Sequence, residues 1–411
     1  MTNEEFNLVR PAFGKGSIAD LSSLYMRALQ AKKVENVPTL MKEAIDEVDH
    51  LVFFLIDGMG HATLKNALKN YRVPALSSYL SKSIYIPITS VFPSTTSTAT
   101  VSIQTGSEPV QHGIIGYTSY LRELGRIFNM ISLAPLGSKD TLMPGAVYDD
   151  EDLVRLGTIY SHLKEPSVSS NLYIPNKIID SGLTRFTGRG ADIHGYYSLS
   201  HMMVTLKRNL ASEKKGFHFC YLSTVDTISH KLGPQTEEVA EEVNSIFKLI
   251  DERLFEFREI EGDLGVIISA DHGHIMIRPD AIIDASIDQK LIPFFAIPVT
   301  GDARAPILRI NEGKMEEALD YIEERYGGHF MAVRSEDLLK MGYFGISEKR
   351  FAKEDRFGDV MLVPIGESGM IDSRLRLLDK EIDFGSLTGV HGGLSQEEMI
   401  VPLISRTKPD R

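Results

Sequence analysis

Residues 51–60 read LVFFLIDGMG, an unbroken apolar run that ends in an aspartate and two nearby glycines. A short run of this kind, bounded by turn residues, is typical of a strand buried on both faces of a parallel sheet. Asp57 then follows the carboxyl end of the strand, where open α/β sheets bind ligands. Because Asp-Gly is also ordinary turn chemistry, this stretch alone leaves a turn and a site as alternatives.

The same pattern recurs along the chain, where apolar segments alternate with amphipathic ones. This alternation predicts an α/β fold with a mostly parallel sheet. Further strands are predicted at 83–92, 217–224 and 264–270. Helices are predicted behind Gly233-Pro234, where apolar residues recur at helical spacing, and over 314–327.

The length of 411 residues suggests two domains, or one large domain with an insertion. We expect a helical lead-in over 1–46 and a core built from 47–290 and 356–411. The segment 291–355 changes character, because two short predicted strands are followed there by a helix. We predict that it forms a small α+β insertion, or cap, between parts of the main sheet.

Charge and composition narrow the class of partner. A formal charge of −12 argues against a protein that binds nucleic-acid polymers by neutralising phosphates. An acidic chain can still bind a small anion, because a bound divalent cation reverses the local field. The single cysteine, Cys220, excludes an internal disulfide. Neither a secretory signal nor a membrane-spanning apolar stretch is recognisable, so we expect a cytoplasmic protein with no membrane partner.

Carboxylates and imidazoles follow several of the predicted strands. Besides Asp57, they are Asp226, His230, Asp271, His272 and, among glycines near the end of the chain, His391. Each histidine taken singly is explained by a capping or core imidazole, but together these are the ligands that a zinc-like divalent ion prefers. The other histidines singled out lack this setting and are interpreted as structural: His61, His112, His194, His201, His218, His274 and His329.

Residues 91–102 read VFPSTTSTATVS and crowd hydroxyls behind a Phe-Pro. This stretch is a polar loop, a helix start, or the site of a nucleophile. A threonine hydroxyl is a poor nucleophile at its own pKa, and metal coordination is one recognised way to activate it. The sequence offers no G-x-S-x-G context that would supply a Ser-His pair instead.

The order of these motifs resembles the alkaline phosphatase superfamily, and in particular its type I phosphodiesterase/nucleotide pyrophosphatase branch. The resemblance spans 51–116, 217–275 and 385–403. Its most specific pieces are FPSTTSTATVSIQTG with EPVQHGIIG behind it, STVDTISHKLGP, and SADHGH. It implies an alkaline-phosphatase-like three-layer sandwich around the mostly parallel sheet, and a hydrolase that uses two divalent metal ions per chain.

The resemblance also implies how the ligands divide between the two ions. One set is Asp226, His230 and His391; the other is Asp57, Asp271 and His272, together with the oxygen of the nucleophile. Zinc is the first choice for a mixed Asp/His set, with manganese or another divalent ion as the alternative.

The nucleophile is placed by counting back from Thr105-Gly106, which matches the Thr-Gly behind the family's nucleophile helix. That register selects Thr96, with Ser94, Thr95 and Ser97 as the alternatives if it slips. If the segment behind Thr96 is helical, Thr96 lies at its start, where backbone N–H groups favour a phosphate. The family reaction implies attack on phosphorus and a phosphothreonine intermediate.

The sequence departs from the family pattern at Tyr117, where nucleotide pyrophosphatases carry an asparagine that holds a phosphoryl oxygen. A tyrosine hydroxyl can donate there, but nucleotide specificity stays open. We expect a small phosphodiester, nucleotide or phosphonate substrate. A phosphonoacetate hydrolase is the main alternative. A phosphomonoesterase is less favoured because no positive side chain stands beside Thr96. A catalytically inactive protein that only binds metal is the non-enzymatic alternative. The oligomeric state stays open.

Overall fold

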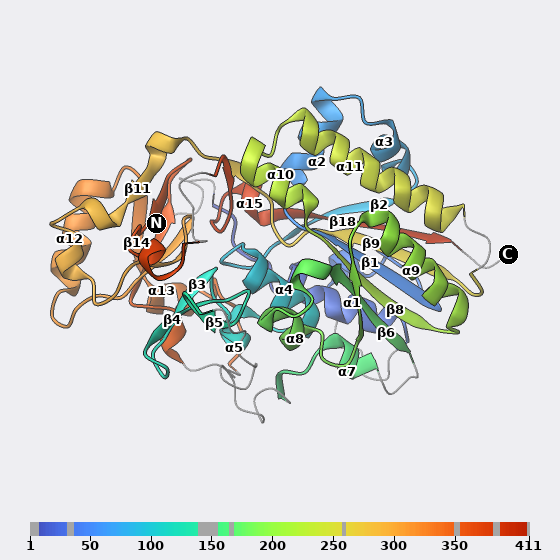
Figure 1. Cartoon of the computed structure of the whole chain (residues 1–411), viewed down its shortest axis with the longest axis horizontal. Coiled ribbons are helices and arrows are strands. Elements are labelled where there is room, and N and C mark those ends of the chain that lie inside the picture. The colour runs from blue at the N-terminus through green and yellow to red at the C-terminus, as the bar shows by residue number, and fades with distance from the viewer. Residues whose placement is uncertain are drawn as a thin grey trace.

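The described part of the chain is built around two seven-stranded sheets (Figure 1). The structure is a computed structural model and describes residues 8–30, 37–138, 155–163, 168–256, 260–348, 354–380 and 387–408. The candidate site residues all lie within these ranges.

The first sheet has the strand order β2-β18-β9-β1-β8-β6-β7. Its strands are β1 (His50–Ile56), β2 (Ile84–Thr89), β6 (Ser169–Pro175), β7 (Asp192–Tyr196), β8 (Gly216–Leu222), β9 (Leu264–Ser269) and β18 (Ile400–Lys408). All pairings from β9 across to β7 are parallel, and β18 runs antiparallel to both of its neighbours. The predicted α/β fold with a mostly parallel sheet is therefore confirmed.

Helices cover both faces of this sheet, which explains why β1, β8 and β9 are buried at every position. In Figure 1, α2 (His61–Asn70), α3 (Pro74–Leu80) and α11 (Glu237–Ile250) lie above the sheet. Below it lie α1 (Leu21–Ala28), α4 (Thr96–Thr105) and α7 (Ile159–Leu163). The result is the expected three-layer sandwich. A strand with both faces in contact with helices must be apolar throughout, as LVFFLI is.

The second sheet has the order β14-β15-β13-β12-β3-β4-β5, and its pairings are antiparallel. Its strands are β3 (Thr118–Leu121), β4 (Arg126–Asn129), β5 (Ala134–Pro135), β12 (Thr300–Asp302), β13 (Ala305–Leu308), β14 (Phe330–Arg334) and β15 (Val360–Pro364), with α12 (Met315–Tyr326) packed beside β14. The sheet thus joins strands of the 291–355 segment to strands from 118–135 and 360–364.

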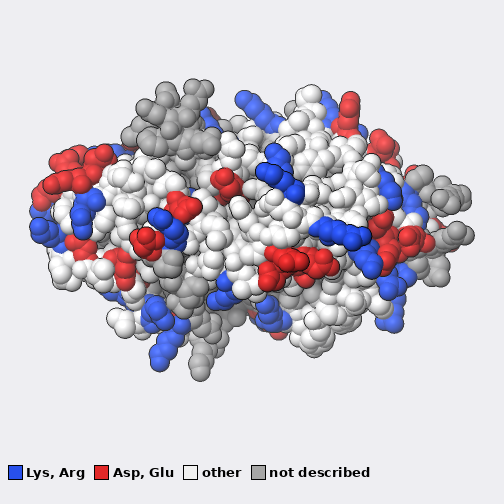
Figure 2. Space-filling view, turned by 90° about the horizontal axis from the view of Figure 1, so that it is seen from above, with Lys and Arg blue, Asp and Glu red and all other residues white. Residues whose placement is uncertain are grey.

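The described surface carries charges of both signs. Figure 2 shows acidic and basic side chains interspersed over the described part of one face. Within the described ranges, each helix is too short or too polar to cross a membrane.

Candidate active site

The site lies at the carboxyl edge of the first sheet. The register pairs Ile56 with Leu222 of β8 and Leu55 with Ser269 of β9, so these three strands end level with one another. Asp57 and Asp271 follow two of these ends and are buried. Parallel strands deliver all their carboxyl ends to one edge, and this is why residues distant in sequence meet there.

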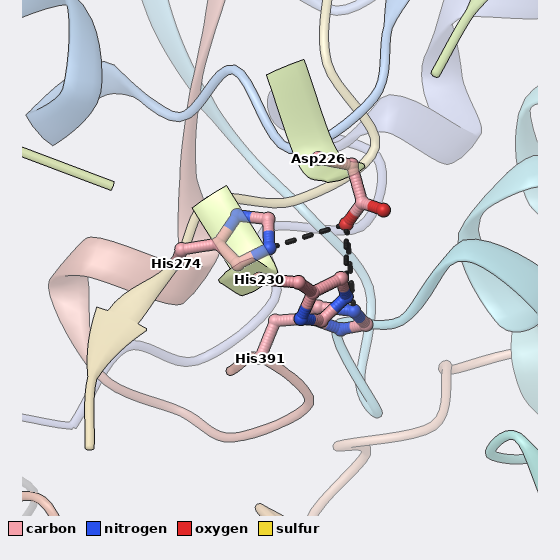
Figure 3. Close-up of side chains that lie close together, drawn as sticks. All are labelled: Asp226, His230, His274 and His391. Carbon is pink, nitrogen blue, oxygen red and sulfur yellow. Dashed lines mark ion pairs between the residues drawn. The ribbon is translucent and has the colours of Figure 1, made fainter. Parts of the chain in front are cut away.

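The third strand end continues into α10 (Thr224–Leu232), which carries Asp226 and His230. Their spacing of four residues puts both side chains on one face of the helix. Nε2 of His230 lies 3.1 Å from Oδ1 of Asp226. His391 approaches from the loop between β17 (Gly389–Val390) and α15 (Gln396–Met399), and its Nε2 lies 3.9 Å from the same oxygen (Figure 3).

His274 joins this cluster, contrary to its interpretation as a structural histidine. Its Nε2 lies 3.1 Å from Oδ1 of Asp226 (Figure 3). One donor atom each from Asp226, His230, His274 and His391 lies within 4.8 Å of the others, a spacing that suits a single metal ion. The sequence contained a signal for His274 as a candidate ligand, because the segment SADHGH carries a second histidine two positions after His272.

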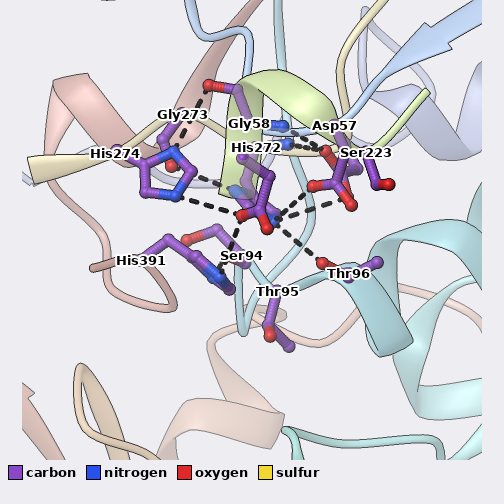
Figure 4. Close-up of polar contacts among 12 residues, drawn as sticks. Asp57, Gly58, Ser94, Thr95, Thr96, Ser223, His272, Gly273, His274 and His391 are labelled. Atoms are coloured by element: carbon purple, nitrogen blue, oxygen red, sulfur yellow. Dashed lines mark hydrogen bonds and ion pairs between the residues drawn. The ribbon is translucent and has the colours of Figure 1, made fainter. Parts of the chain in front are cut away.

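A second group surrounds His272, whose Nε2 lies 3.4 Å from Oδ1 of Asp57 (Figure 4). Nε2 of His272 also lies 3.4 Å from Oδ2 of Asp271. The same nitrogen lies 3.2 Å from Oγ1 of Thr96. The other oxygen of Asp57 accepts a short hydrogen bond from the hydroxyl of Tyr221. One donor atom each from Asp57, Asp226 and His272 also falls within 4.8 Å of the others, so the two groups adjoin at Asp226.

The electrostatics of the site require positive charge. Burial, reinforced by the neighbouring Asp271 and Asp226, raises the pKa of Asp57 well above its usual value. Burial also acts to raise the pKa of Asp226, but His230 and His274 outweigh it and hold that pKa well below its usual range. Three carboxylates packed this closely repel one another unless cations lie among them.

Unsatisfied atoms point to the same requirement. Among the described residues, four buried side-chain atoms of the site have no hydrogen-bond partner: Oδ1 of Asp57, Oδ1 of Asp226, Oδ2 of Asp271 and Nε2 of His274. Leaving such atoms unpaired is costly, and metal ions are the usual partner of buried carboxylates and imidazoles in combination. The residues present therefore fit divalent metal ions.

The hydroxyl groups of VFPSTTSTATVS differ in their burial and in their hydrogen-bond partners. Four of them are buried and are occupied by partners within the protein: Ser94 donates to the carbonyl of Gly393, Thr95 to Oδ1 of Asp302, Ser97 to the carbonyl of Gly116, and Thr98 accepts from the N–H of Gly116. Thr96 is the one partly exposed residue of 94–98, and its hydroxyl faces His272. It is the first residue of α4, as expected, and Thr95 is the N-cap.

A cavity of about 430 Å³ opens in front of Thr96. Its walls include Asp57, Asp226, His230 and His391 from the two groups. Lys177 and Lys231 also line it, and these are cations that the sequence around Thr96 did not reveal.

Tyr117, the predicted substrate-binding residue, lines the same cavity. Its hydroxyl oxygen accepts a hydrogen bond of 2.9 Å from the side chain of Asn129, and its backbone N–H donates to Oδ2 of Asp302. Asp302 was not predicted from the sequence. It is the last residue of β12, and it brings the second sheet into the wall of the cavity.

A sequence model of the type I phosphodiesterase/nucleotide pyrophosphatase family matches residues 51–368. The chain belongs to this family. The predicted membership is thereby confirmed, and with it the coarse class of phosphodiester or pyrophosphate hydrolase that describes the family.

The fold of this chain is similar to those of two solved structures. Murine ectonucleotide pyrophosphatase/phosphodiesterase 5 superposes with a TM-score of 0.60 at 15% identity, over 86% of this chain and 87% of that one. An inactive threonine-to-alanine variant of that protein has been solved in complex with AMP. Phosphonoacetate hydrolase from Sinorhizobium meliloti 1021, in complex with phosphonoacetate, superposes with a TM-score of 0.59 at 19% identity, over 86% of this chain and 89% of that one.

Proposed function

We propose that this protein is a two-metal phosphodiesterase or nucleotide pyrophosphatase that acts on a small molecule through Thr96. The observation that carries the proposal is the contrast among the hydroxyls of 94–98. The other four are buried and occupied by protein partners, whereas Thr96 is partly exposed and its Oγ1 lies 3.2 Å from His272. The inactive threonine variant of the murine neighbour supports a threonine nucleophile.

The chain's own residues would hold the two ions in two adjoining sets. Asp226, His230 and His391 form one set, and Asp57, Asp271, His272 and Thr96 form the other. When bound, the ions supply the positive charge that activates the hydroxyl and stabilises the charge developing on the phosphoryl group. Zinc suits the mixed oxygen and nitrogen donors, with manganese as the alternative.

The reaction then follows from the position of Thr96 at the start of α4. The backbone N–H groups of the first helical turn have no partner within the helix and favour a phosphoryl group. Oγ1 of Thr96 forms a bond to phosphorus while the bond to the leaving oxygen breaks. Water then cleaves the phosphothreonine and regenerates Thr96. Tyr117, oriented by Asn129, is positioned to donate a hydrogen bond to the phosphoryl group.

The test compares the metal-loaded parent with Thr96→Ala on bis-p-nitrophenyl phosphate. Loss of the nucleophile is expected to lower the rate by on the order of a thousandfold or more. Thr100→Val is the matched control, because Thr100 is buried on the same helix, its hydroxyl has no hydrogen-bond partner within the described ranges, and valine has nearly the same shape. Acid quenching and peptide mapping should find a p-nitrophenyl phosphoryl group on Thr96 only, because attack on this diester releases one of its two p-nitrophenolate groups.

Two results would count against the proposal. Thr96→Ala with the activity of the parent would show that another group attacks phosphorus. A parent that turns over none of a panel of dinucleotides, nucleotide sugars, simple diesters and phosphonoacetate would favour the inactive scaffold instead.

A phosphonate with an anionic leaving group is the second candidate, and the two lysines of the cavity favour it. Lys177 and Lys231 bring positive charge to the cavity that the metal ligands line, which suits a carboxylate or a second phosphate on the substrate. A phosphomonoester would use the same charge. If this candidate is right, phosphonoacetate is hydrolysed faster than bis-p-nitrophenyl phosphate, whose ester groups carry no charge. The double substitution Lys177→Met and Lys231→Met then removes that preference.

A further inference from the structure

His274 is the one member of the imidazole cluster that the family resemblance does not assign. It directly precedes β10 (Ile275–Met276), and its side chain is buried. Its ring centroid lies 4.9 Å from that of His230 and 5.1 Å from that of His391. The side chain therefore faces the same point as the two predicted histidine ligands, as Figure 3 shows.

The hydrogen bonds of these rings decide which nitrogen can accept. Nδ1 of His274 lies 3.3 Å from the carbonyl oxygen of Gly58. In the same way, Nδ1 of His230 faces the carbonyl of Gly389 and Nδ1 of His391 faces that of Ser94. A carbonyl oxygen can only accept, so in each neutral ring Nδ1 carries the proton and Nε2 keeps its lone pair. This is the arrangement that second partners give to metal-binding histidines.

With this tautomer, no proton lies between the facing atoms of His274 and Asp226. Nε2 of His274 and Oδ1 of Asp226 lie 3.1 Å apart, and neither has a hydrogen-bond partner among the described residues. With the proton on Nδ1, both atoms are acceptors and oppose each other. A cation that both atoms ligate removes the conflict.

The chain also makes room for this ring. Gly58 has φ of +73°, and a Cβ built on it would meet Cε1 of His274 at 2.4 Å. Any larger residue at 58 would therefore be strained and would displace the imidazole. Gly58 directly follows Asp57, so the turn that ends β1 also provides the space that His274 occupies.

We propose that His274 is a fourth protein ligand of the ion held by Asp226, His230 and His391, which gives an Asp/His₃ set for a zinc-like divalent cation. The inference rests on the proposed two-metal function but concerns only how the ion is held. Four protein ligands fill a tetrahedral shell, whereas the group around His272 includes Thr96, which must meet the substrate. The ion at His274 is accordingly the more tightly held and more slowly exchanging of the two.

The experiment compares His274→Leu and His274→Gln in the full chain, with His218→Gln as a control at a buried histidine outside the cluster. The zinc dissociation constants are measured by competition with a chromophoric chelator. Both His274 variants are expected to weaken the tighter site by on the order of a hundredfold, and the control is expected to keep it. Visible spectra of Co²⁺ at that site should change in both variants, because the ligand set sets the geometry of the ion.

Two outcomes would overturn the inference. Unchanged affinity in both variants means that His274 is no ligand. Affinity kept by the glutamine and lost by the leucine means that His274 acts only as a hydrogen-bond donor to Asp226. Zinc-edge anomalous diffraction of the parent settles the point even if the variants fail to fold: a ligand requires Nε2 at about 2.0–2.1 Å from the ion, and a position clearly beyond that contradicts it. None of these measurements uses hydrolysis, so they stand apart from failure of the proposed function.

Discussion

The hydroxyl of Thr95 donates a hydrogen bond to Oδ1 of Asp302, 3.0 Å away, and so joins the start of the α4 helix to the second sheet. The other oxygen of Asp302 accepts from the backbone N–H of Tyr117. One buried carboxylate from β12 thus fixes the residue before Thr96 and the backbone of the residue predicted to contact the phosphoryl group. The second sheet contributes directly to the geometry of the site.

Asp302→Asn should lower kcat by about tenfold to a hundredfold, because it replaces one acceptor oxygen with an amide NH2, so the side chain can no longer accept from both Thr95 and Tyr117. Burial raises the pKa of Asp302 to about 7. The carboxylate form accepts both donors better, so the rate of the parent should rise with pH through that value, and the asparagine variant should lack this ionisation. The pH–rate profile is the measurement. Exposed Asp280→Asn is the control, and a variant profile identical to that of the parent would contradict the role.

His391→Ala should lower the metal bound per chain by about one ion, since it removes one donor from a shared site. Metal analysis of the dialysed protein by plasma mass spectrometry checks this. Asp226→Ala should lower it by at least as much, because Asp226 belongs to both donor groups. His329 lies outside the cluster, so the control His329→Ala should bind as much metal per chain as the parent. Full metal content in His391→Ala would show that the ligand assignment is wrong.

The pair of Arg304 and Glu398 is a buried ion pair, with Nη2 of the arginine 2.8 Å from Oε2 of the glutamate. Glu398 also accepts from the N–H of Gly393, two residues beyond His391. Glu398→Gln should lower the free energy of unfolding by about 3 kcal/mol, because it leaves a buried guanidinium without its counter-charge. Urea unfolding measures this.

The matched control for that pair is Glu336→Gln, which breaks an exposed helical pair with Lys340. Solvent screens such pairs, so no measurable change in stability is expected there. Equal effects of the two substitutions would mean that burial of the Arg304 pair does not matter.

His112 should make the protein sensitive to acid. Burial, with a contribution from Arg356, lowers the pKa of His112 to about 3, whereas an unfolded histidine titrates near 6.5. Between these values the unfolded chain binds one more proton, so stability is lost as pH falls, by about 1.4 kcal/mol per pH unit. His112→Asn keeps an acceptor for the N–H of Ile114 but does not titrate, so its slope should be shallower by that amount.

Unfolding by urea at several pH values within this window measures the two slopes. Exposed His201→Asn serves as the control and should follow the parent. Parallel curves for the parent and His112→Asn would contradict the prediction.

The first sheet and the edge that carries the site could be predicted from local sequence patterns. An apolar run such as LVFFLI is typical of a strand buried on both faces of a parallel sheet covered by helices, and parallel strands bring their carboxyl ends together. Asp57, Asp271 and His272 follow such ends directly, so their meeting could be predicted. The spacing of Asp226 and His230 likewise suits one face of α10.

The other side chains that complete the site depend on how distant segments pack against one another. His274 enters because Gly58, far away in sequence, leaves space for its ring. Asp302 enters because the second sheet packs against the start of α4. The choice of Thr96 among its neighbours depends on partners such as Gly393 and Gly116 that satisfy the other hydroxyls. These are contacts between distant segments, and no local periodicity or spacing encodes them.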